Sequence, residues 1–287
     1  MELDNTIFVE KMLESYKNLT SNYLQLYSAL LEKKKTNTIH DIRVCSRRLI
    51  TLLNFYLSQC NSYYANNLNK ILKFYFRNLS KLRDVQIQIE NNQTKSIQSA
   101  EWKCFLDYLS SKEKKLKQKI NELFTENSRL EIEGLMFFFK DDLKNSINNG
   151  EITINDLVSR INQQFKKCIL FLQNINIDHA VTIHNFRIEF KKFRYLYELL
   201  YPFYHRVMLE SKELGKYQTL LGNIQDSEVL LNYIMNYIQK QKGKGNFKEL
   251  LIEANQQKTK HIILFFEKKD ELFKFWDKTL FLDTNTN

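Results

Sequence analysis

Two stretches of this sequence, IHDIRVCSRR at 39–48 and IHNFRIEFKK at 183–192, repeat one unusual pattern, a histidine followed by cations. Aligning the two histidines gives an offset of 144 residues in a chain of 287. The matched positions are His40 with His184, Arg43 with Arg187, Arg47 with Lys191, and Arg48 with Lys192. A second phrase recurs at nearly the same offset, as NLSKLRDV around Asp84 and GNIQDSEV around Asp226. The repeat predicts a duplicated half-domain whose two copies face one anion.

Composition predicts that these phrases lie on helices. One Pro and six Gly are few for 287 residues, and folds rich in strands and turns use both residues at their turns. Apolar residues recur at spacings of three and four, as at Leu72, Phe76, Leu79 and Leu82, which is the spacing of one helical face. We therefore expect an all-α fold, with two pseudo-symmetric antiparallel four-helix bundles forming one domain around a basic central cleft.

The expected domain covers 1–287 and consists of two repeats, at about 1–145 and about 150–285. Polar breaks such as NNQTKS and NSINNGE separate the helices. The predicted helices are about 5–34, 38–58, 62–90, 97–128, 130–146, 153–173, 179–201, 205–240 and 247–280.

The cations of each repeated phrase fall on one helical face, because successive residues of an α-helix turn by about 100°. Like charges along one face destabilise a helix unless acids or a ligand neutralise them. Glu198 falls near the second stripe, whereas Asp41 lies off the first. A solvated basic surface would explain one such helix, but two copies in register favour anion binding. The candidate binding residues on these helices are His40, Arg43, Arg47, Arg48, His184, Arg187, Lys191, Lys192 and Arg194.

The helix after each repeated phrase carries a further basic stripe. Lys70, Lys73 and Arg77 share one face, and Lys212 and Lys216 form a shorter stripe in the second copy. We expect these five residues to extend the anion path, with ordinary surface cations as the alternative.

Asp84 and Asp226 are acids that recur inside the basic repeat. Such an acid is expected to orient an arginine or cap a neighbour rather than to contact the ligand. By contrast, the lysines clustered at 112–119 cover several helical faces and have no match in the second half, which is typical of a solvated surface.

The charge balance and the missing motifs narrow the function. The chain has 43 basic and 33 acidic residues, a net charge of +10, which indicates an anionic partner without identifying it. It contains no GxxxxGK[ST], HExxH or ExExK and no acidic cluster suited to magnesium, which phosphoryl transfer or hydrolysis would need. We therefore predict no catalytic residues, no metal and no cofactor, and expect a binding protein rather than an enzyme.

The sequence also bears on the compartment. The four cysteines form no CxxC and no zinc spacing, as expected for reduced thiols in a cytosolic protein. No apolar run approaches the roughly 18–20 residues that a membrane span needs, and the N-terminal residues contain no apolar signal core. We expect a cytoplasmic protein without a membrane partner.

Four phrases together resemble the CHAD domain, the conserved-histidine α-helical domain: HDIRVCSRR at 40–48, LRD at 82–84, HNFRIEFKKFRYLYE at 184–198 and LLGNIQD at 220–226. The resemblance extends over nearly the whole chain and implies two pseudo-symmetric four-helix bundles with a basic central cleft. It further implies binding of inorganic polyphosphate, possible association with polyphosphate granules, and ligand contacts from the His, Arg and Lys residues of the two repeated helices. Ile50 departs from the family pattern, which has a cation there, and predicts a weaker first-half site.

Three functions are compatible with the sequence. The first is noncatalytic binding of inorganic polyphosphate, for granule targeting or scaffolding. The second is a nucleic-acid-binding helical protein, since nucleic acid offers the same phosphate charges and the chain is rich in aromatic residues that could stack on bases. The third is an accessory subunit of a phosphohydrolase. Protein partners are not predicted.

Overall fold

The computed structural model describes residues 5–32, 38–177, 179–203, 205–242 and 247–276. These residues form ten α-helices and one 3-10 helix, and no strand occurs among them. The elements are α1 (Asn5–Leu31), α2 (Thr38–Tyr56), α3 (Tyr63–Asn92), α4 (Lys95–Gln98), α5 (Ala100–Leu123), α6 (Glu126–Asn148), α7 (Ile154–Gln173), α8 (Ala180–Glu198), α9 (His205–Lys240), α10 (Lys248–Lys268) and η1 (Lys269–Lys274). The prediction of an all-α chain is confirmed.

Most predicted helices are present with ends shifted by a few residues. The helix expected at 97–128 is present as α5, but it is shorter at both ends. Ser99 has extended backbone (φ −142°, ψ 130°) and separates α4 from α5. Phe124 is also extended (φ −91°, ψ 108°) and ends α5, so α6 begins at Glu126. The helix expected at 247–280 is shorter too, since α10 ends at Lys268 and residues beyond 276 lie outside the described part.

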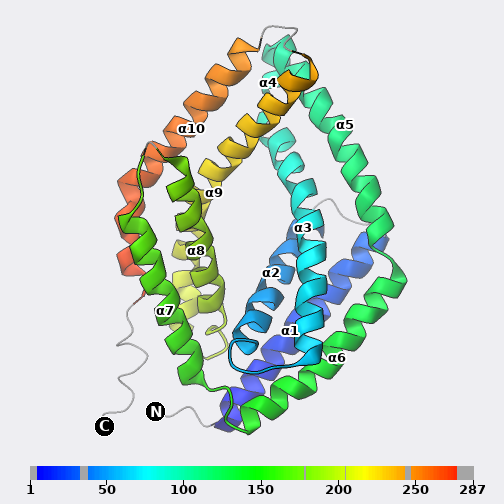
Figure 1. Cartoon of the computed structure of the whole chain (residues 1–287), viewed down its shortest axis with the longest axis vertical. Helices are drawn as coiled ribbons and strands as arrows, with labels where there is room; N and C mark the ends of the chain where they lie inside the picture. Colours follow the sequence, from blue (N-terminus) through cyan, green and yellow to red (C-terminus); the bar gives the residue numbers. More distant parts are fainter. Residues whose placement is uncertain (1–4, 33–37, 178, 204, 243–246, 277–287) are drawn as a thin grey trace.

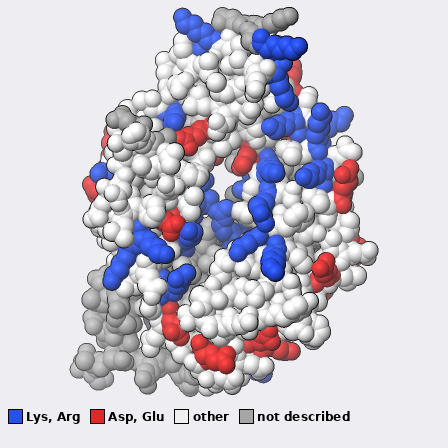
Figure 2. All heavy atoms as spheres, in the orientation of Figure 1, with Lys and Arg blue, Asp and Glu red and all other residues white. Residues whose placement is uncertain are grey.

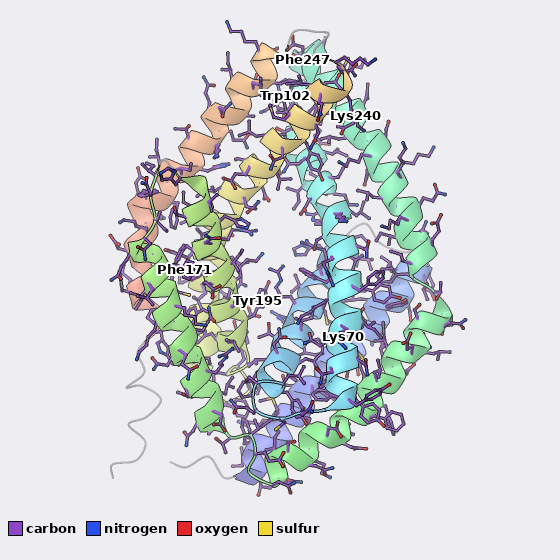
Figure 3. The ribbon with its side chains drawn as sticks, viewed as in Figure 1. Lys70, Trp102, Phe171, Tyr195, Lys240 and Phe247 are labelled. Carbon is purple, nitrogen blue, oxygen red and sulfur yellow. The ribbon has the colours of Figure 1, made fainter. Side chains whose placement is uncertain are left out.

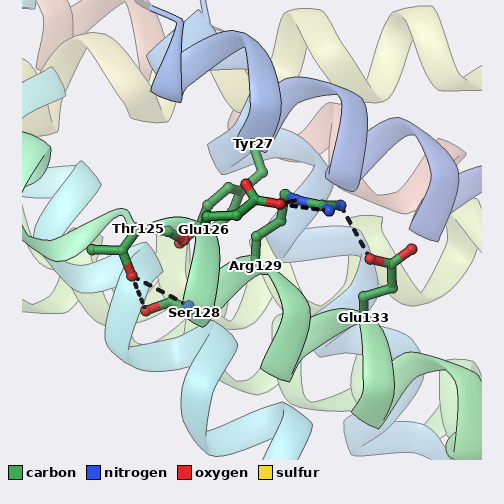
Figure 4. A network of polar contacts seen from close by, with 6 residues as sticks. All are labelled: Tyr27, Thr125, Glu126, Ser128, Arg129 and Glu133. Atoms are coloured by element: carbon green, nitrogen blue, oxygen red, sulfur yellow. Dashed lines mark hydrogen bonds and ion pairs between the residues drawn. The ribbon is translucent and has the colours of Figure 1, made fainter.

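A polar network fixes the break between α5 and α6 (Figure 4). The side chain of Thr125 accepts a hydrogen bond from the Ser128 backbone at 3.2 Å, which caps a helix start that would otherwise leave amides unpaired. The Tyr27 hydroxyl of α1 donates to the Thr125 carbonyl at 3.2 Å. Arg129 pairs with Glu126 at 2.7 Å and with Glu133 at 3.1 Å along α6. Local capping by Thr125 therefore starts α6 at Glu126, before the start at about 130 that the apolar pattern predicted.

The helices of each half pack mainly on one another. In the first half, α1 packs on α2 and α6, and α3 packs on α2, α5 and α6; in the second half, α7, α8, α9 and α10 pack in sequence. Besides contacts of α5 with α9 and α10, the halves meet where α2 contacts α8 and α3 contacts α9. Figure 1 shows these pairs facing each other across the middle of the molecule. The helices that carry the repeated phrases, α2 and α8, are thus neighbours.

Two apolar clusters form the core. The larger cluster includes residues of both halves, with aromatic packing on α8 by Phe190, Phe193 and Tyr197. The smaller cluster joins the far ends of α3, α5, α9 and α10 around Trp102, where Figure 3 also labels Lys240 and Phe247.

The two repeated aspartates, Asp84 and Asp226, lie at the boundary between these clusters. On α3, Leu82 belongs to the larger cluster and Val85 to the smaller, with Asp84 between them; on α9, Asp226 lies between Ile224 and Leu230 in the same way. Both aspartates therefore occupy equivalent places, where the larger cluster ends and the smaller one begins. None of the described helices is long and apolar enough to cross a membrane.

Candidate anion-binding site

The basic face of α8 is fixed by the apolar face opposite it. Phe186, Phe190 and Phe193 are completely buried, and burying each phenylalanine contributes roughly 1.5–3 kcal/mol. Arg187 and Lys191 each lie one residue beyond a buried phenylalanine, so they turn toward α2 and α3. On α2, the buried positions 42, 45, 49 and 52 orient the basic stripe in the same way.

Arg47 joins the two repeats at their contact. Its guanidinium lies 4.7 Å from the Phe76 ring centroid on α3 and 5.4 Å from the Tyr195 ring centroid on α8. Figure 3 labels Tyr195 on the side of α8 that faces α2 and α3. Cation–π contacts hold a charge in place without neutralising it, so Arg47 keeps its capacity to bind an anion.

Six charged groups interact around this contact, and we call them the central cluster. Arg43 and Arg187 are partly buried. Burial lowers the pKa of Arg43 to about 10, against the opposing effect of Asp84. Burial likewise lowers the pKa of Arg187, and Asp226 opposes it. The central cluster comprises Arg43, Arg47, Asp84, Arg187, Lys191 and Asp226.

Lys191 has the most strongly lowered pKa of the central cluster. Burial, followed by repulsion from Arg47, Arg187 and Arg43, lowers its pKa to about 6. Asp226 counteracts this shift only in part. An ammonium whose pKa falls this far lacks sufficient anionic neighbours, and a bound anion would supply them.

The two aspartates are shared by the repeats. Burial raises the pKa of Asp84, while Arg43, Arg187 and Lys191 lower it. Burial also raises the pKa of Asp226, and Arg187 is the cation that opposes this most. Each aspartate therefore interacts first with the arginine of its own repeat, as expected for a structural partner.

Arg187 and Arg43 differ in their hydrogen bonds. Arg43 Nε donates to Ser80 Oγ at 3.2 Å, whereas Arg187 Nε is buried and has no hydrogen-bond partner within the described part of the chain. A buried donor without a partner is unfavourable by roughly 1–3 kcal/mol. A ligand oxygen beside Arg187 would remove this penalty.

Glu198 neutralises one side of the contact between α2 and α8. Its carboxylate accepts from Arg48 Nε at 2.9 Å and from Arg194 Nε at 3.0 Å. The Glu198 side chain is only 4% exposed. The expectation that Glu198 compensates the basic stripe agrees with this geometry, and it leaves Arg48 and Arg194 less available to a ligand than Arg47 or Lys191.

The two histidines occupy different environments. His184 Nδ1 hydrogen-bonds Gln225 Oε1, which joins the repeated phrase on α8 to the LLGNIQD phrase on α9. His40 is exposed on α2. When Asp84 is aligned with Asp226, Arg83 aligns with Gln225. In the first repeat, the position of the amide that contacts His184 is therefore occupied by a cation.

The remaining predicted residues lie on the surface of the site. Lys73 Nζ donates to Asn54 Oδ1 of α2 at 3.1 Å, and Arg77 Nε donates to the Lys73 carbonyl at 3.1 Å. Exposed cations with no contact to the central cluster among the described interactions are Lys70, Lys192, Lys212 and Lys216. Two of these pair within their own helices, Lys192 with Glu189 at 2.6 Å and Lys216 with Glu213 at 2.7 Å.

The space-filling view supports this grouping. Figure 2 shows an opening near the middle of the molecule, with Lys and Arg side chains around it. Asp and Glu form a group at the lower edge of the same face, and others are scattered over it, some close to the opening.

Comparison with known proteins identifies the family. The sequence profile of the CHAD domain matches residues 20–234, about three quarters of the chain. This chain belongs to the CHAD domain family. The crystal structure of the CHAD domain from the plant Ricinus communis is similar in fold, with a TM-score of 0.67 and 16% sequence identity over 93% of this chain and 89% of that one. No curated protein matches the sequence.

The matched region includes every predicted binding residue of this CHAD domain. The structure also shows residues in contact with them that the repeat did not indicate. Phe76 follows a core spacing, so its role beneath Arg43 and Arg47 was not predictable from periodicity. Ser80 and Asn54 bear no charge and gave no signal. Tyr195 and Gln225 belong to the family phrases, and that was the signal that could have identified them.

Proposed function

We propose that this CHAD domain binds inorganic polyphosphate, without catalysing a reaction on it, in a basic central cleft lined by its two pseudo-symmetric four-helix halves. The observation that carries the proposal is the central cluster, where cations from both repeats converge and the pKa of Lys191 falls to about 6. Such an excess of positive charge destabilises the unliganded protein, and a bound polyanion would neutralise the charge and remove this destabilisation.

The ligand class follows from the donors. Arginine grips two phosphate oxygens at once, while lysine supplies a more mobile point charge. The central cluster contains three arginines and one lysine from two helices, which suits a flexible chain of repeated phosphates. Part of the affinity would come from counterions released by the polyanion, so binding should weaken steeply with salt.

Binding alone accounts for the groups present. Arginine and lysine donors need neither a metal nor a nucleophile to hold phosphate. We infer that the protein acts in the cytoplasm as a scaffold or as a module that targets polyphosphate granules.

Nucleic acid is the second candidate, because α3 exposes Tyr63 and Phe74 and single-strand binders stack bases on such rings. In the central cluster, however, Arg47 already covers Phe76 and Tyr195. That arrangement favours a ligand without bases.

The decisive experiment is competition. Fluorescently labelled long-chain polyphosphate is bound by the wild-type protein, and single-stranded nucleic acid of equal charge is added as competitor. The proposal expects displacement only at a large excess of nucleic acid. Displacement at equal charge would support the second candidate, and release of phosphate during incubation with polyphosphate and magnesium would show catalysis.

A further inference from the structure

The two sides of the contact between α2 and α8 are not equivalent. In the register of the repeat, Lys192 corresponds to Arg48 and Asn54 corresponds to Glu198. On one side Glu198 neutralises Arg48 and Arg194. On the other side the residue in its place is an uncharged amide, so the repeat does not supply Lys192 with an equivalent acid.

A pocket of about 440 Å³ lies on this second side, between α2, α7 and α8. We call it the α7 pocket. Its cations are Arg160 and Lys167 of α7 and Lys192 of α8, and the amides of Asn54 and Gln164 also line it. The size is within the range of small-ligand sites, and the donors are those that hold phosphate oxygens.

The charge of the α7 pocket is positive even after the acid that pairs with Lys192 is counted. Glu189 accepts from Lys192 Nζ at 2.6 Å and from Gln164 Nε2 at 2.8 Å. Burial raises the pKa of Glu189, but these two bonds and the charges of Lys192 and Lys167 lower it overall. The pocket lining contains three cations and no acid, and the one carboxylate that pairs with it, Glu189, interacts with Lys192 and Lys167 and not with Arg160 among the described interactions.

The α7 pocket continues from the central cluster. Thr51, which lines the pocket, lies one helical turn after Arg47 on α2, a rise of about 6 Å. Lys192 directly follows Lys191. Asn54 also accepts a hydrogen bond from Lys73 of α3, so the stripe on α3 borders the same place.

We propose that the α7 pocket binds phosphate groups of the polyphosphate chain where that chain leaves the central cluster. The chain then continues along α7, and it does not continue past Glu198, where the cations are already neutralised. This inference rests on the proposed function, since it assigns a direction to the same ligand.

Neighbouring lysines on α7 provide a matched test. Lys166 and Lys167 are both exposed on α7, but only Lys167 lines the pocket. With labelled long-chain polyphosphate, Lys167→Glu should weaken binding by about fivefold or more, whereas Lys166→Glu should change it by less than about twofold. Net charge and helix are the same in the two variants.

A second pair of variants tests the pocket by introducing the carboxylate that Glu198 supplies on the opposite side of the contact. Asn54→Glu places a carboxylate where the repeat has Glu198, next to Lys192 and Lys73, and it should also weaken binding by about fivefold. The control is Asn91→Glu, the same change at an exposed position of α3 outside the pocket.

Amine footprinting tests the wild-type protein directly, so a folding defect cannot mask the result. Saturating polyphosphate should slow reductive methylation of Lys167 and Lys192 and leave Lys166 unchanged. If Lys166 and Lys167 were equally protected and their two variants bound polyphosphate equally well, the proposal for the α7 pocket would be wrong. The proposal for the central cluster would then still stand. Failure of the wild-type protein to bind polyphosphate would overturn both proposals.

Discussion

Two regions of this molecule are rich in cations, and they differ in what surrounds those cations. On α5, Lys114, Lys115 and Lys117 are exposed, and Lys117 pairs with Glu113 of its own helix at 2.7 Å. In the central cluster, Arg187 and Lys191 are partly buried and have pKa values lowered by that burial. Similar side chains are therefore solvated in one region and held at a cost in the other.

This difference supports the proposal that the central cluster, and not the lysines of α5, binds the anion. Exposed charges contribute little to stability and little to specificity. Burying a charge without sufficient partners is unfavourable, and a fold that does so in both repeats has a use for the charge. The predictions below test whether environment, rather than the net charge of +10, determines binding.

The largest effect is expected from charge reversal in the two regions. Arg187→Glu with Lys191→Glu should weaken polyphosphate binding by at least about tenfold, because each charge-assisted contact contributes roughly 1.5–3 kcal/mol. Lys114→Glu with Lys115→Glu changes net charge equally and should have a far smaller effect. Titrations at several salt concentrations should also give a shallower salt dependence for the first variant.

Circular dichroism and melting of both double variants provide the control. Since Arg187 and Lys191 are partly buried, the milder pair Arg187→Gln with Lys191→Gln should be measured alongside. Equal losses in both regions would mean that overall charge binds the ligand and that the repeated motif is structural.

Binding should also depend on pH through Lys191. Its pKa is about 6 in the free protein, and bound phosphate would raise this pKa toward the ordinary lysine value of 10.5. Between about pH 6 and pH 10.5, binding of the ligand therefore takes up a proton. Affinity should be constant below about pH 6 and then fall by up to about tenfold per pH unit above it. Calorimetry in buffers of different ionisation enthalpy measures the proton uptake directly.

The variant Lys191→Met removes the titrating group and should abolish this pH dependence, whereas Lys115→Met on α5 should preserve it. A wild-type affinity that stays constant between pH 6 and pH 8 would contradict the role assigned to Lys191.

As pH rises above about 6, the stability of the fold should increase while the affinity for polyphosphate decreases. Because the pKa of Lys191 is lower in the folded protein than in the unfolded chain, the unfolded chain binds more protons between about pH 6 and pH 10.5. Stability from this group therefore rises with pH across that window. At pH 7, Lys191→Met should raise the melting temperature by a few degrees, since ~1 kcal/mol corresponds to about 2–4 °C at this size.

Differential scanning calorimetry of Lys191→Met and Lys115→Met checks this effect. A lower melting temperature for Lys191→Met than for the wild type would show that the lysine stabilises the fold and is not retained at a cost.

The sequence predicted the arrangement of the site better than its details. The shared register of His40 and His184 placed their helices together, because a duplicated half-domain repeats its contacts about one axis, and α2 does contact α8. The break between α5 and α6 was expected between 128 and 130 but lies at Phe124 and Thr125, because capping by Thr125 is a local effect that the apolar spacing does not show. The α7 pocket was missed because Arg160 and Lys167 match Tyr16 and Tyr23 in the first repeat, so the repeat gave no signal there.

The smallest effects should come from the outer stripes, where lysines near the α7 pocket can be compared with lysines far from it. Lys73 is held by Asn54 beside the α7 pocket, whereas Lys216 pairs with Glu213 of its own helix and is largely exposed. Lys70→Ala with Lys73→Ala should weaken polyphosphate binding by about threefold. Lys212→Ala with Lys216→Ala should weaken it by less than about twofold, as expected for solvated and screened charges. The two doubles remove equal charge, so anisotropy titrations at one salt concentration compare them directly. A larger loss from the α9 pair would extend the anion path along α9 and would mean that exposure and local pairing do not decide which lysines bind.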